Sequence, residues 1–370
     1  MRKKKVLLLG GAGAIGGYVA SMCLSFGYEV HSTTRASRYE DGIVFHQGNA
    51  KNYLWLEPLL RDQRYDAIVD FMVYRTVEFE SRISSLLSLT DHYVFLSSYR
   101  VYDDSKGAAL VESASRLIES TENKGFLKTD EYALAKGRQE NVLFSSPSDN
   151  WSIVRPSITY SNGRFQFGCL EANTILPRAA EGLPVVIPEE MLNKHATMTW
   201  AGDAGLMIAK LLFNEGAFGG AFNVCSPESV TWRRIGELYK KYIGLKVTPV
   251  DMDSYLSLGL NPYQVKYDRM FDRQCSSEKV LTVTGIHRSE LMVLQEGLRL
   301  ELKKSETKKR TSSMTRIHGR MDRLAGIQRL FKARGVKAFV SYLSGYIRFV
   351  NYFIVQYRLR KSVPRYRPMS

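Results

Sequence analysis

The chain has 370 residues, of which 44% are hydrophobic and 24% are charged. This composition is typical of a folded, water-soluble protein, and it excludes both a disordered chain and a bundle of membrane helices. The four cysteines lie far apart, with no CxxC pair and no Cys/His cluster at metal spacing. We therefore expect no disulfide framework, no metal site and a reducing, cytoplasmic location.

The net charge of +15 is distributed unevenly along the chain. Residues 303–370 contain 18 Lys and Arg against two acids, which gives +16. The 34 basic and 35 acidic side chains that remain for residues 1–302 give −1. Any partner that the basicity implies should therefore bind the tail and not the body.

The first element is a short, wholly apolar run at Val6–Leu9, which predicts a strand buried on both faces of a parallel sheet. The glycine-rich sequence GGAGAIG follows at residues 10–16, and a helical pattern begins there. Gly10 permits a tight turn, Gly13 lets backbone N–H groups approach a pyrophosphate, and Gly16 allows close packing of helix and strand. The helix N-terminus favours phosphate charge, so the segment predicts a dinucleotide site. We expect it to be lined by Gly10, Gly13, Ala14, Ile15 and Gly16.

The choice of dinucleotide depends on a position about twenty residues after the first glycine, where an acid would bind the ribose 2′-OH of NAD. This segment contains Arg35 and Arg38 and no acid before Glu40. Two guanidinium groups suit a 2′-phosphate, which favours NADP over NAD. The alternative is that both arginines are solvated loop residues.

Strands and helices then continue to alternate. Apolar runs predict further strands, and helical spacing separates them; the strands are expected at residues 28–31, 43–45, 66–71, 92–96 and 151–156. This alternation predicts an α/β fold with a Rossmann-type, doubly wound parallel sheet.

Three side chains suggest proton transfer. Ser98 follows the strand at 92–96, at the sheet edge where such folds bind ligands. Tyr132 and Lys136 share one face of a helix predicted over about 130–144. The ammonium would favour the phenolate and lower the pKa of Tyr132. We therefore predict that Tyr132 is the general acid/base of a carbonyl–alcohol interconversion, and that Ser98 hydrogen-bonds the same substrate oxygen.

The order of these motifs resembles the extended short-chain dehydrogenase/reductases that act on nucleotide sugars. The matching pieces, within residues 5 to about 300, include GGAGAIG, SSYRVY at 97–102, YALAK at 132–136, WSIVRP at 151–156, TWAGDA at 199–204 and FNV at 222–224. The resemblance implies that Ser98, Tyr132 and Lys136 form the catalytic triad, with Lys136 also binding the nicotinamide ribose. It further implies a contact with adenine from Asn49, and substrate contacts from Ser98, Asn173 and Arg273.

Two departures from the family pattern narrow the reaction. Sugar dehydratases of this family carry Asp-Glu after the catalytic hydroxyl, where this chain has Tyr99 and Arg100, so a 4,6-dehydratase is disfavoured. The arginine that would bind a diphosphate, ahead of the Asp203 segment, has no clear match. Lys194 and His195 are the nearest substitutes, and the alternative is that they are surface residues.

We expect four regions in the chain. An extended short-chain dehydrogenase/reductase domain should occupy 1–302, with a cofactor part over about 1–160 plus a later strand and a smaller α/β substrate lobe over about 161–302. A charged linker at 303–316 and a basic amphipathic helical tail at 317–370 should follow.

The tail combines a periodic apolar and aromatic face with basic flanks. Apolar residues recur at helical spacing over 317–331, and aromatic residues do so over 339–357. Such a helix suits an anionic membrane surface, which we favour; packing on the body or in a homodimer comes next, and nucleic acid last. A membrane-spanning helix is disfavoured because Arg348 would lie near its centre.

The sequence thus predicts an NADP-preferring oxidoreductase or epimerase of a nucleotide-activated sugar, held at the inner face of a cytoplasmic membrane by its tail. The activity would be that of a sugar 4-epimerase or a keto-sugar reductase, and no residue separates the two. A lipid-linked sugar substrate would explain tail and body together. The alternative is a non-catalytic dinucleotide-fold module whose basic tail binds RNA or a membrane complex.

Overall fold

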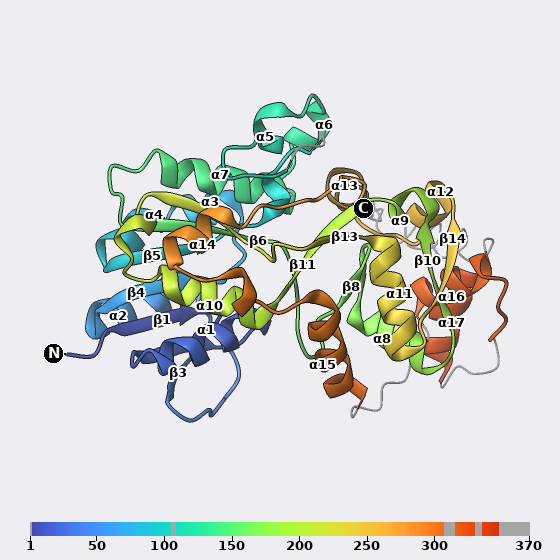
Figure 1. Cartoon of the computed structure of the whole chain (residues 1–370), viewed down its shortest axis with the longest axis horizontal. Helices are drawn as coiled ribbons and strands as arrows, with labels where there is room; N and C mark the ends of the chain where they lie inside the picture. Colours follow the sequence, from blue (N-terminus) through green and yellow to red (C-terminus); the bar gives the residue numbers. More distant parts are fainter. Residues whose placement is uncertain (1, 105–108, 307–314, 330–334, 348–370) are drawn as a thin grey trace, which may run out of the picture.

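A computed structural model describes residues 2–104, 109–306, 315–329 and 335–347. Its centre is a seven-stranded parallel sheet in the order β12-β6-β5-β4-β1-β2-β3 (Figure 1). The strands of this sheet are β1 (Lys5–Leu9), β2 (Glu29–Thr34), β3 (Ile43–Gln47), β4 (Tyr65–Asp70), β5 (Thr90–Leu96), β6 (Trp151–Pro156) and β12 (Gly220–Val224). The predicted Rossmann-type fold is confirmed.

Strand β1 shows why the apolar runs form central strands. Val6 and Leu8 point into one core, whereas Leu7 and Leu9 point into the core on the opposite face of the sheet. All four side chains are fully buried. Because both faces of a parallel sheet are covered by helices, the run has no polar alternation.

Helices cover both faces of the sheet. One core is shared with α1 (Ala14–Ser25), α10 (Ala201–Leu211) and α14 (Glu278–Thr284). The other is shared with α2 (Tyr53–Gln63), α3 (Thr76–Glu80), α4 (Ile83–Ser88) and α7 (Tyr132–Phe144). Short helical segments follow β5, namely η1 (Tyr99–Val101), α5 (Leu117–Ser120) and α6 (Lys124–Leu127), and η2 (Glu215–Ala217) precedes β12.

A second lobe lies beyond the carboxyl ends of the strands and has its own core around Trp232 and Tyr239 (Figure 1). Its strands are β7 (Ile158–Tyr160), β8 (Gln166–Phe167), β9 (Leu170–Glu171), β10 (Pro184–Pro188), β11 (His195–Trp200), β13 (Ser229–Thr231) and β14 (Lys246–Val250). Its helical elements are α8 (Ala172–Ala180), α9 (Glu189–Leu192), α11 (Trp232–Ile243), α12 (Met252–Leu256), α13 (Pro262–Gln264), η3 (Val265–Arg269), η4 (Arg288–Glu290) and α15 (Leu294–Glu306). This lobe falls within the range of the expected α/β substrate lobe, and its binding of a substrate stays a prediction.

The basic tail departs from the predicted layout. Residues 303–306, expected in a linker, continue helix α15, and the described tail consists of two short helices, α16 (Arg316–Leu324) and α17 (Val336–Tyr346). Both lie at the end of the second lobe far from the N-terminus (Figure 1). Residues 348–370, which include the second half of the predicted aromatic helix, lie outside the described residues.

The helices α16 and α17 pack on the second lobe through a buried ion pair. Asp322 is fully buried and accepts hydrogen bonds from Nη2 of Arg178 on α8 (2.7 Å), Nε of Arg329 (2.7 Å) and the hydroxyl of Tyr342 (2.8 Å). Met321 joins the core of the lobe. Of the predicted alternatives, packing on the body therefore applies to the described part of the tail.

The two tail helices approach each other backbone to backbone. A Cβ added to Gly319 of α16 would strike the carbonyl oxygen of Tyr342, and one added to Gly345 of α17 would strike the carbonyl oxygen of Arg316. Only glycine permits this crossing. Among the described residues, no helix is both long and apolar enough to cross a membrane.

Candidate active site

The glycine-rich turn between β1 and α1 has the geometry of a phosphate cradle. Gly10 has φ +72°, a conformation that favours glycine. A Cβ on Gly16 would strike the backbone of Gly11, so Gly16 packs on the turn itself, a refinement of the predicted contact with the strand. Gly13 precedes α1 and gives its N-terminus no side-chain cap. The N–H groups of the first turn of α1 therefore remain available for an anion.

A cavity of about 220 Å³ connects this turn to the ends of β5 and β6. The predicted residues Gly10, Gly13, Ala14, Ile15, Gly16, Ser98 and Tyr132 all line it, together with Phe71, Val73, Leu96, Ser97, Pro156, Ser157, Thr159 and Arg164. The sheet thus brings the glycine turn, the strand-end serine and the helical tyrosine together, as the sequence predicts.

Tyr132 opens α7, and its phenol lies within hydrogen-bonding reach of the Ser98 hydroxyl. Burial raises the pKa of Tyr132 above its ordinary value. The nearby charges of Arg100 and Arg164 and the bond to Ser98 oppose this rise without cancelling it. In the protein alone, Tyr132 is therefore a protonated phenol, which suits a proton donor.

The predicted action of Lys136 on Tyr132 is wrong for this state of the protein. The Lys136 ammonium donates to the carbonyl oxygens of Leu96 (2.6 Å) and Met72 (3.4 Å) and lies 4.3 Å from the ring centre of Phe95. It does not line the cavity, and the cations that act on Tyr132 are arginines. Burial lowers the pKa of Lys136 to about 8, so its charge is itself costly.

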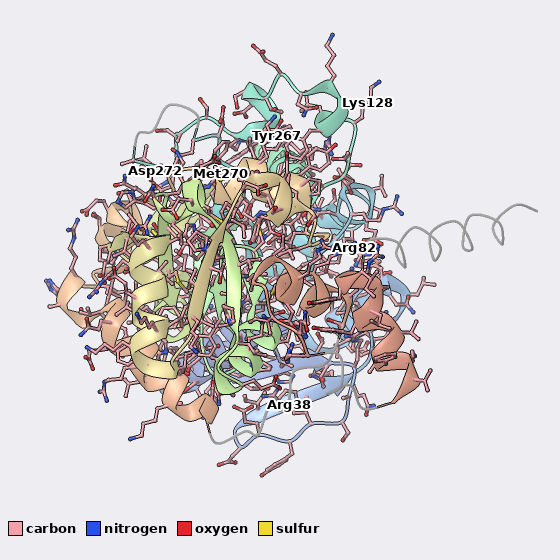
Figure 2. The ribbon with its side chains drawn as sticks, turned by 90° about the vertical axis from the view of Figure 1, so that its right-hand side faces the viewer. Arg38, Arg82, Lys128, Tyr267, Met270 and Asp272 are labelled. Carbon is pink, nitrogen blue, oxygen red and sulfur yellow. The ribbon has the colours of Figure 1, made fainter. Side chains whose placement is uncertain are left out.

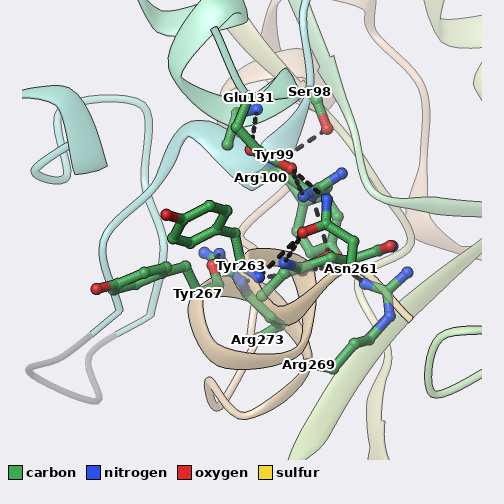
Figure 3. A network of polar contacts seen from close by, with 12 residues as sticks. Ser98, Tyr99, Arg100, Glu131, Asn261, Tyr263, Tyr267, Arg269 and Arg273 are labelled. Carbon is green, nitrogen blue, oxygen red and sulfur yellow. Dashed lines mark hydrogen bonds and ion pairs between the residues drawn. The ribbon is translucent and has the colours of Figure 1, made fainter. Parts of the chain in front are cut away.

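Arg100 ties the end of β5 to the second lobe (Figure 3). Its Nη2 lies 2.7 Å from Glu131 Oε1, its Nε lies 3.2 Å from Asp268 Oδ2, and its guanidinium carbon lies 5.1 Å from the ring centre of Tyr132. Burial would raise the pKa of Asp268, but three surrounding arginines hold it below its ordinary value. Sugar dehydratases of the family were expected to carry Asp-Glu at the positions of Tyr99 and Arg100. In this chain the second of these positions therefore holds an ion-paired guanidinium beside Tyr132.

Arg164 is a functional candidate that no sequence motif indicated. It lies in the turn after β7, where Ser161 and Arg164 exchange backbone hydrogen bonds and Gly163 has φ +84°. Its exposed side chain lines the cavity close to Tyr132, and no ion pair joins it to another residue that the structure describes. The sequence shows an arginine nine positions after Arg155, but the direction of its side chain depends on the turn.

The residues predicted to select the dinucleotide lie near the glycine turn at the surface. Arg38 donates to the carbonyl oxygen of Ala12 (3.2 Å) and pairs with Glu40 (3.0 Å). Figure 2 shows it on the N-terminal part of the chain, coloured blue. Arg35 and Asn49 are exposed. None of these three lines the cavity, so it covers only the inner end of a dinucleotide site.

Of the substrate contacts implied by resemblance, Ser98 lines the cavity, whereas Asn173 and Arg273 do not. Asn173 is exposed near the start of α8, and Arg273 is buried, donating to the carbonyl oxygens of Tyr102 and Tyr267 (both 2.9 Å). His195 is paired with Asp272 at 2.7 Å. These residues line no part of the cavity, and Arg273 instead joins Tyr102, in the segment after β5, to Tyr267 in the second lobe.

The residues fit a dinucleotide on three grounds: the positive φ of Gly10, the backbone cradle that a Cβ at Gly16 would fill, and the uncapped start of α1. When bound, a nicotinamide supplies or takes up a hydride. The arrangement can then give a proton to, or take one from, an oxygen placed between Ser98 and Tyr132. Among the described residues, no group of three or more His, Cys, Asp or Glu could hold a metal ion.

The fold and the cavity define a Rossmann-type dinucleotide-binding protein. Residues 6–188 match the NAD dependent epimerase/dehydratase family. The chain belongs to this family of extended short-chain dehydrogenases, whose motifs it carries.

Solved structures of this family share the fold. The UDP-glucose 4-epimerase of Thermotoga maritima, solved with UDP-glucose, has a TM-score of 0.63 at 14% identity and covers 82% of this chain and 99% of its own. The UDP-glucuronic acid 4-epimerase of Bacillus cereus, solved with UDP-glucuronic acid and NAD, has a TM-score of 0.62 at 15% identity and the same coverage. At these identities the likeness concerns the fold.

A curated relative also matches part of the chain. The chain is 22% identical over 247 residues to the chloroplast stem-loop binding protein of 41 kDa b of Arabidopsis thaliana. The match covers 62% of this chain and spans 61% of the length of that relative.

Proposed function

We propose that the protein is an NADP-preferring oxidoreductase or epimerase of a nucleotide-activated sugar, with Tyr132 as general acid/base. The observation that carries the proposal is the single cavity lined by the glycine turn, Ser98 and Tyr132. Membership of the epimerase/dehydratase family and the sugar nucleotides of the structural neighbours support the substrate class. A lipid-linked form of the sugar is part of the proposal.

The chemistry assigns one role to each side chain. The Tyr132 phenol donates its proton to the carbonyl oxygen of the sugar as the carbonyl carbon is reduced to an alcohol. In the oxidation of the alcohol, it takes the proton back. The Ser98 hydroxyl holds the same oxygen. In the protein alone Lys136 donates to the carbonyl oxygen of Leu96, a residue that lines the cavity; with a dinucleotide bound, its ammonium would turn to a ribose hydroxyl.

Arg164 takes the role left open by the missing diphosphate arginine. Its guanidinium is exposed, lines the cavity and lies close to Tyr132. A phosphate or carboxylate of the substrate would satisfy it by a charge-assisted, two-point contact. We therefore assign the recognition of a substrate anion to Arg164.

The preference for NADP rests on Arg35 and Arg38. Arg38 already contacts the carbonyl oxygen of Ala12 in the glycine turn, and Arg35 is exposed nearby in sequence. A 2′-phosphate at this site would meet two cations and one acid, Glu40, which pairs with Arg38 and offsets part of its charge.

The test is a Tyr132→Phe variant assayed with a panel of UDP- and dTDP-sugars and both dinucleotides. The variant should bind NADP normally and lose at least a hundredfold in turnover, because only the proton-transfer group is removed. Tyr242→Phe is the matched control, since Tyr242 also precedes a lysine by four residues but lies outside the cavity. Co-purified nicotinamide would favour the epimerase, and a readily released cofactor the reductase.

A second candidate is a non-catalytic RNA-binding module, favoured by the match to the stem-loop binding protein. Under this alternative Tyr132→Phe leaves every measurable function intact, and stem-loop RNA is retained by the wild-type chain in a filter-binding assay. Loss of turnover in Tyr132→Phe without any RNA binding supports the enzyme. The proposed membrane location is separate, because it depends on the tail and not on the cavity.

A further inference from the structure

Arg100 contacts both Ser98 and Tyr132 but does not itself line the cavity. Its backbone N–H donates to Oγ of Ser98 at 3.2 Å (Figure 3). Its guanidinium carbon lies 5.1 Å from the ring centre of Tyr132. A substrate in the cavity would therefore meet Ser98 and Tyr132 and not Arg100, so any effect of Arg100 on the reaction acts through these two residues.

The side chain of Arg100 bridges two carboxylates that belong to different lobes. Nη2 donates to Oε1 of Glu131 at 2.7 Å, and Nε lies 3.2 Å from Oδ2 of Asp268 in η3. The side chain of Arg100 is 14% exposed, that of Glu131 is 8% exposed and that of Asp268 is 1% exposed. Because water screens such pairs weakly, this bridge holds its geometry better than a surface ion pair would.

Glu131 transmits the bridge to the start of α7. It directly precedes Tyr132, and its Oε2 accepts a hydrogen bond from the backbone N–H of Ala133 at 2.8 Å. Its other oxygen, Oε1, binds Arg100 and also accepts from Nδ2 of Asn261 at 3.2 Å. The carboxylate therefore caps the helix with one oxygen and is held by the bridge with the other. Fixing this cap fixes the backbone from which the phenol of Tyr132 projects.

Asp268 gives the bridge a fixed end in the second lobe. Its Oδ1 accepts from the hydroxyl of Tyr99 at 3.0 Å, and its Oδ2 accepts from Nη1 of Arg269 at 2.5 Å. Arg269 donates in turn to the carbonyl oxygen of Gly168 at 2.8 Å. The segment η3 is a π-helical turn, a form that often occurs at functional sites. A shift of the second lobe would therefore displace Arg100 and, with it, the cap of α7.

The charges around Tyr132 act in opposite directions. Burial is the largest cause and raises the pKa of the phenol, Arg100 and Arg164 lower it, and Glu131 raises it. Arg164 is exposed, whereas Arg100 is largely buried, so solvent screens the charge of Arg100 less. Among the cations near the phenol, Arg100 is therefore the one that the fold holds in place.

We propose, on the basis of the proposed function, that Arg100 is a positioning residue of the reaction. Through Glu131 and Asp268 it holds the start of α7 against the second lobe. It thereby keeps the Tyr132 phenol beside Ser98, with a positive charge next to the ring.

The first experiment follows the protonation of Tyr132 in the full chain without substrate. 3-Fluorotyrosine incorporated in place of Tyr132 gives one ¹⁹F signal, whose chemical shift reports the charge of that phenol. Arg100→Met should move the titration midpoint to higher pH, because a positive charge that favours the phenolate is removed. Glu131→Gln should move it to lower pH, because the amide oxygen can still cap α7 while the negative charge is lost. Arg138→Met is the matched control, since it removes another arginine of α7, paired with Asp130 and outside the cavity, and the midpoint should stay in place.

The second experiment measures kcat and KM with the best substrate of the sugar-nucleotide panel. Arg100→Met should lower kcat at least about tenfold and change KM less than about threefold, because the proton donor is misplaced while the groups that line the cavity remain. Arg100→Lys keeps the charge but lacks the planar fork that spans two carboxylates. It should therefore keep the midpoint of the wild type and recover only part of kcat.

The variants should fold, because none of them leaves a buried charge without a partner. In Arg100→Met, Asp268 keeps its ion pairs with Arg269 and Arg273, and Glu131 keeps its bonds to the backbone of α7 and to the second lobe. Circular dichroism verifies the fold, and Glu131→Gln tests the proposal if the variants of Arg100 do not fold.

The proposal is overturned if Arg100→Met titrates like Arg138→Met, or if Arg100→Lys recovers the full kcat, since the bridge would then not matter. If Tyr132→Phe loses turnover and Arg100→Met does not, the proposed function stands and the role of Arg100 is refuted. If Tyr132→Phe keeps turnover while the Arg100 and Glu131 variants move the midpoint in opposite directions, the proposed function fails and the control of Tyr132 by Arg100 is supported.

Discussion

Removal of the Asp322 carboxylate should destabilise the protein far more than removal of an exposed acid. In Asp322→Ala, Arg178 keeps its charge in a site with no solvent exposure, Tyr342 loses its acceptor, and Arg329 keeps its pair with Glu181. Breaking a buried ion pair in this way costs about 3–5 kcal/mol. Tyr342→Phe removes one hydrogen bond from the same carboxylate and should cost about 1 kcal/mol.

Urea unfolding followed by circular dichroism measures both free energies. Glu296→Ala, which removes an acid half-exposed in its pair with Arg299, is the control and should cost less than about 0.5 kcal/mol. Limited proteolysis reports whether α16 and α17 detach before the body unfolds. Such detachment would let water reach Arg178 and make the loss of stability in Asp322→Ala smaller. A loss below about 1 kcal/mol with the tail still resistant to protease would contradict the proposed role of this ion pair.

Three further predictions concern the cavity. Lys136→Met should raise the free energy of unfolding by about 1–2 kcal/mol at pH 7 while abolishing turnover, because the buried ammonium, with its pKa lowered to about 8, is lost. The folded wild type loses this proton at a lower pH than the unfolded chain, so its free energy of unfolding rises between about pH 8 and 10.5. Urea titrations should therefore show that the difference in stability between the variant and the wild type decreases over this range. A difference that stays constant would contradict this cause. Arg164→Gln should raise the KM for an anionic substrate by about tenfold or more with NADP affinity unchanged, whereas a weakened NADP affinity would reassign Arg164 to the cofactor. Arg35→Gln/Arg38→Gln should weaken NADP binding about tenfold and leave NAD binding unchanged in a fluorescence titration; equal losses would remove the basis for the NADP preference.

The central fold was predictable because its signals are local. The run Val6–Leu9 needs only its own composition to indicate a strand buried on both faces, and Gly10 needs only its place after that strand. The helical register of Tyr132 and Lys136 follows equally from their spacing. Such features depend on residues within a few positions of one another.

The electrostatics of the cavity depend on contacts that no local pattern contains. Lys136 turns towards the carbonyl oxygen of Leu96, forty residues away in sequence, and so leaves Tyr132 to two arginines. One of them, Arg164, is directed by a turn whose backbone bonds are invisible in the sequence. The resemblance to a family suggested Arg273 as a substrate contact, whereas the structure employs it as a buried cross-link.

In the tail, too, local features could be predicted from the sequence and long-range contacts could not. Its helical periodicity was readable, and Met321 packs on the body as an apolar position should. Which face is covered depends on Asp322 and Arg178, which are separated by 144 residues. Charge composition alone could not show which face of α17 packs on the body, because the helix is buried on one side and exposed on the other.

Strand β12 closes one edge of the central sheet although a large part of the second lobe, from β7 to β11, precedes it in the chain. On the ribosome, residues 1–160 therefore emerge without their last strand, and the edge of β6 stays open until Val224 has been synthesised. A fragment ending near residue 160 should then aggregate through that edge, and an enzyme of this architecture cannot be shortened to its nucleotide half. In a circular permutant in which β12 precedes β1, β12 would already be synthesised when β6 emerges, and the edge of the sheet could close at once.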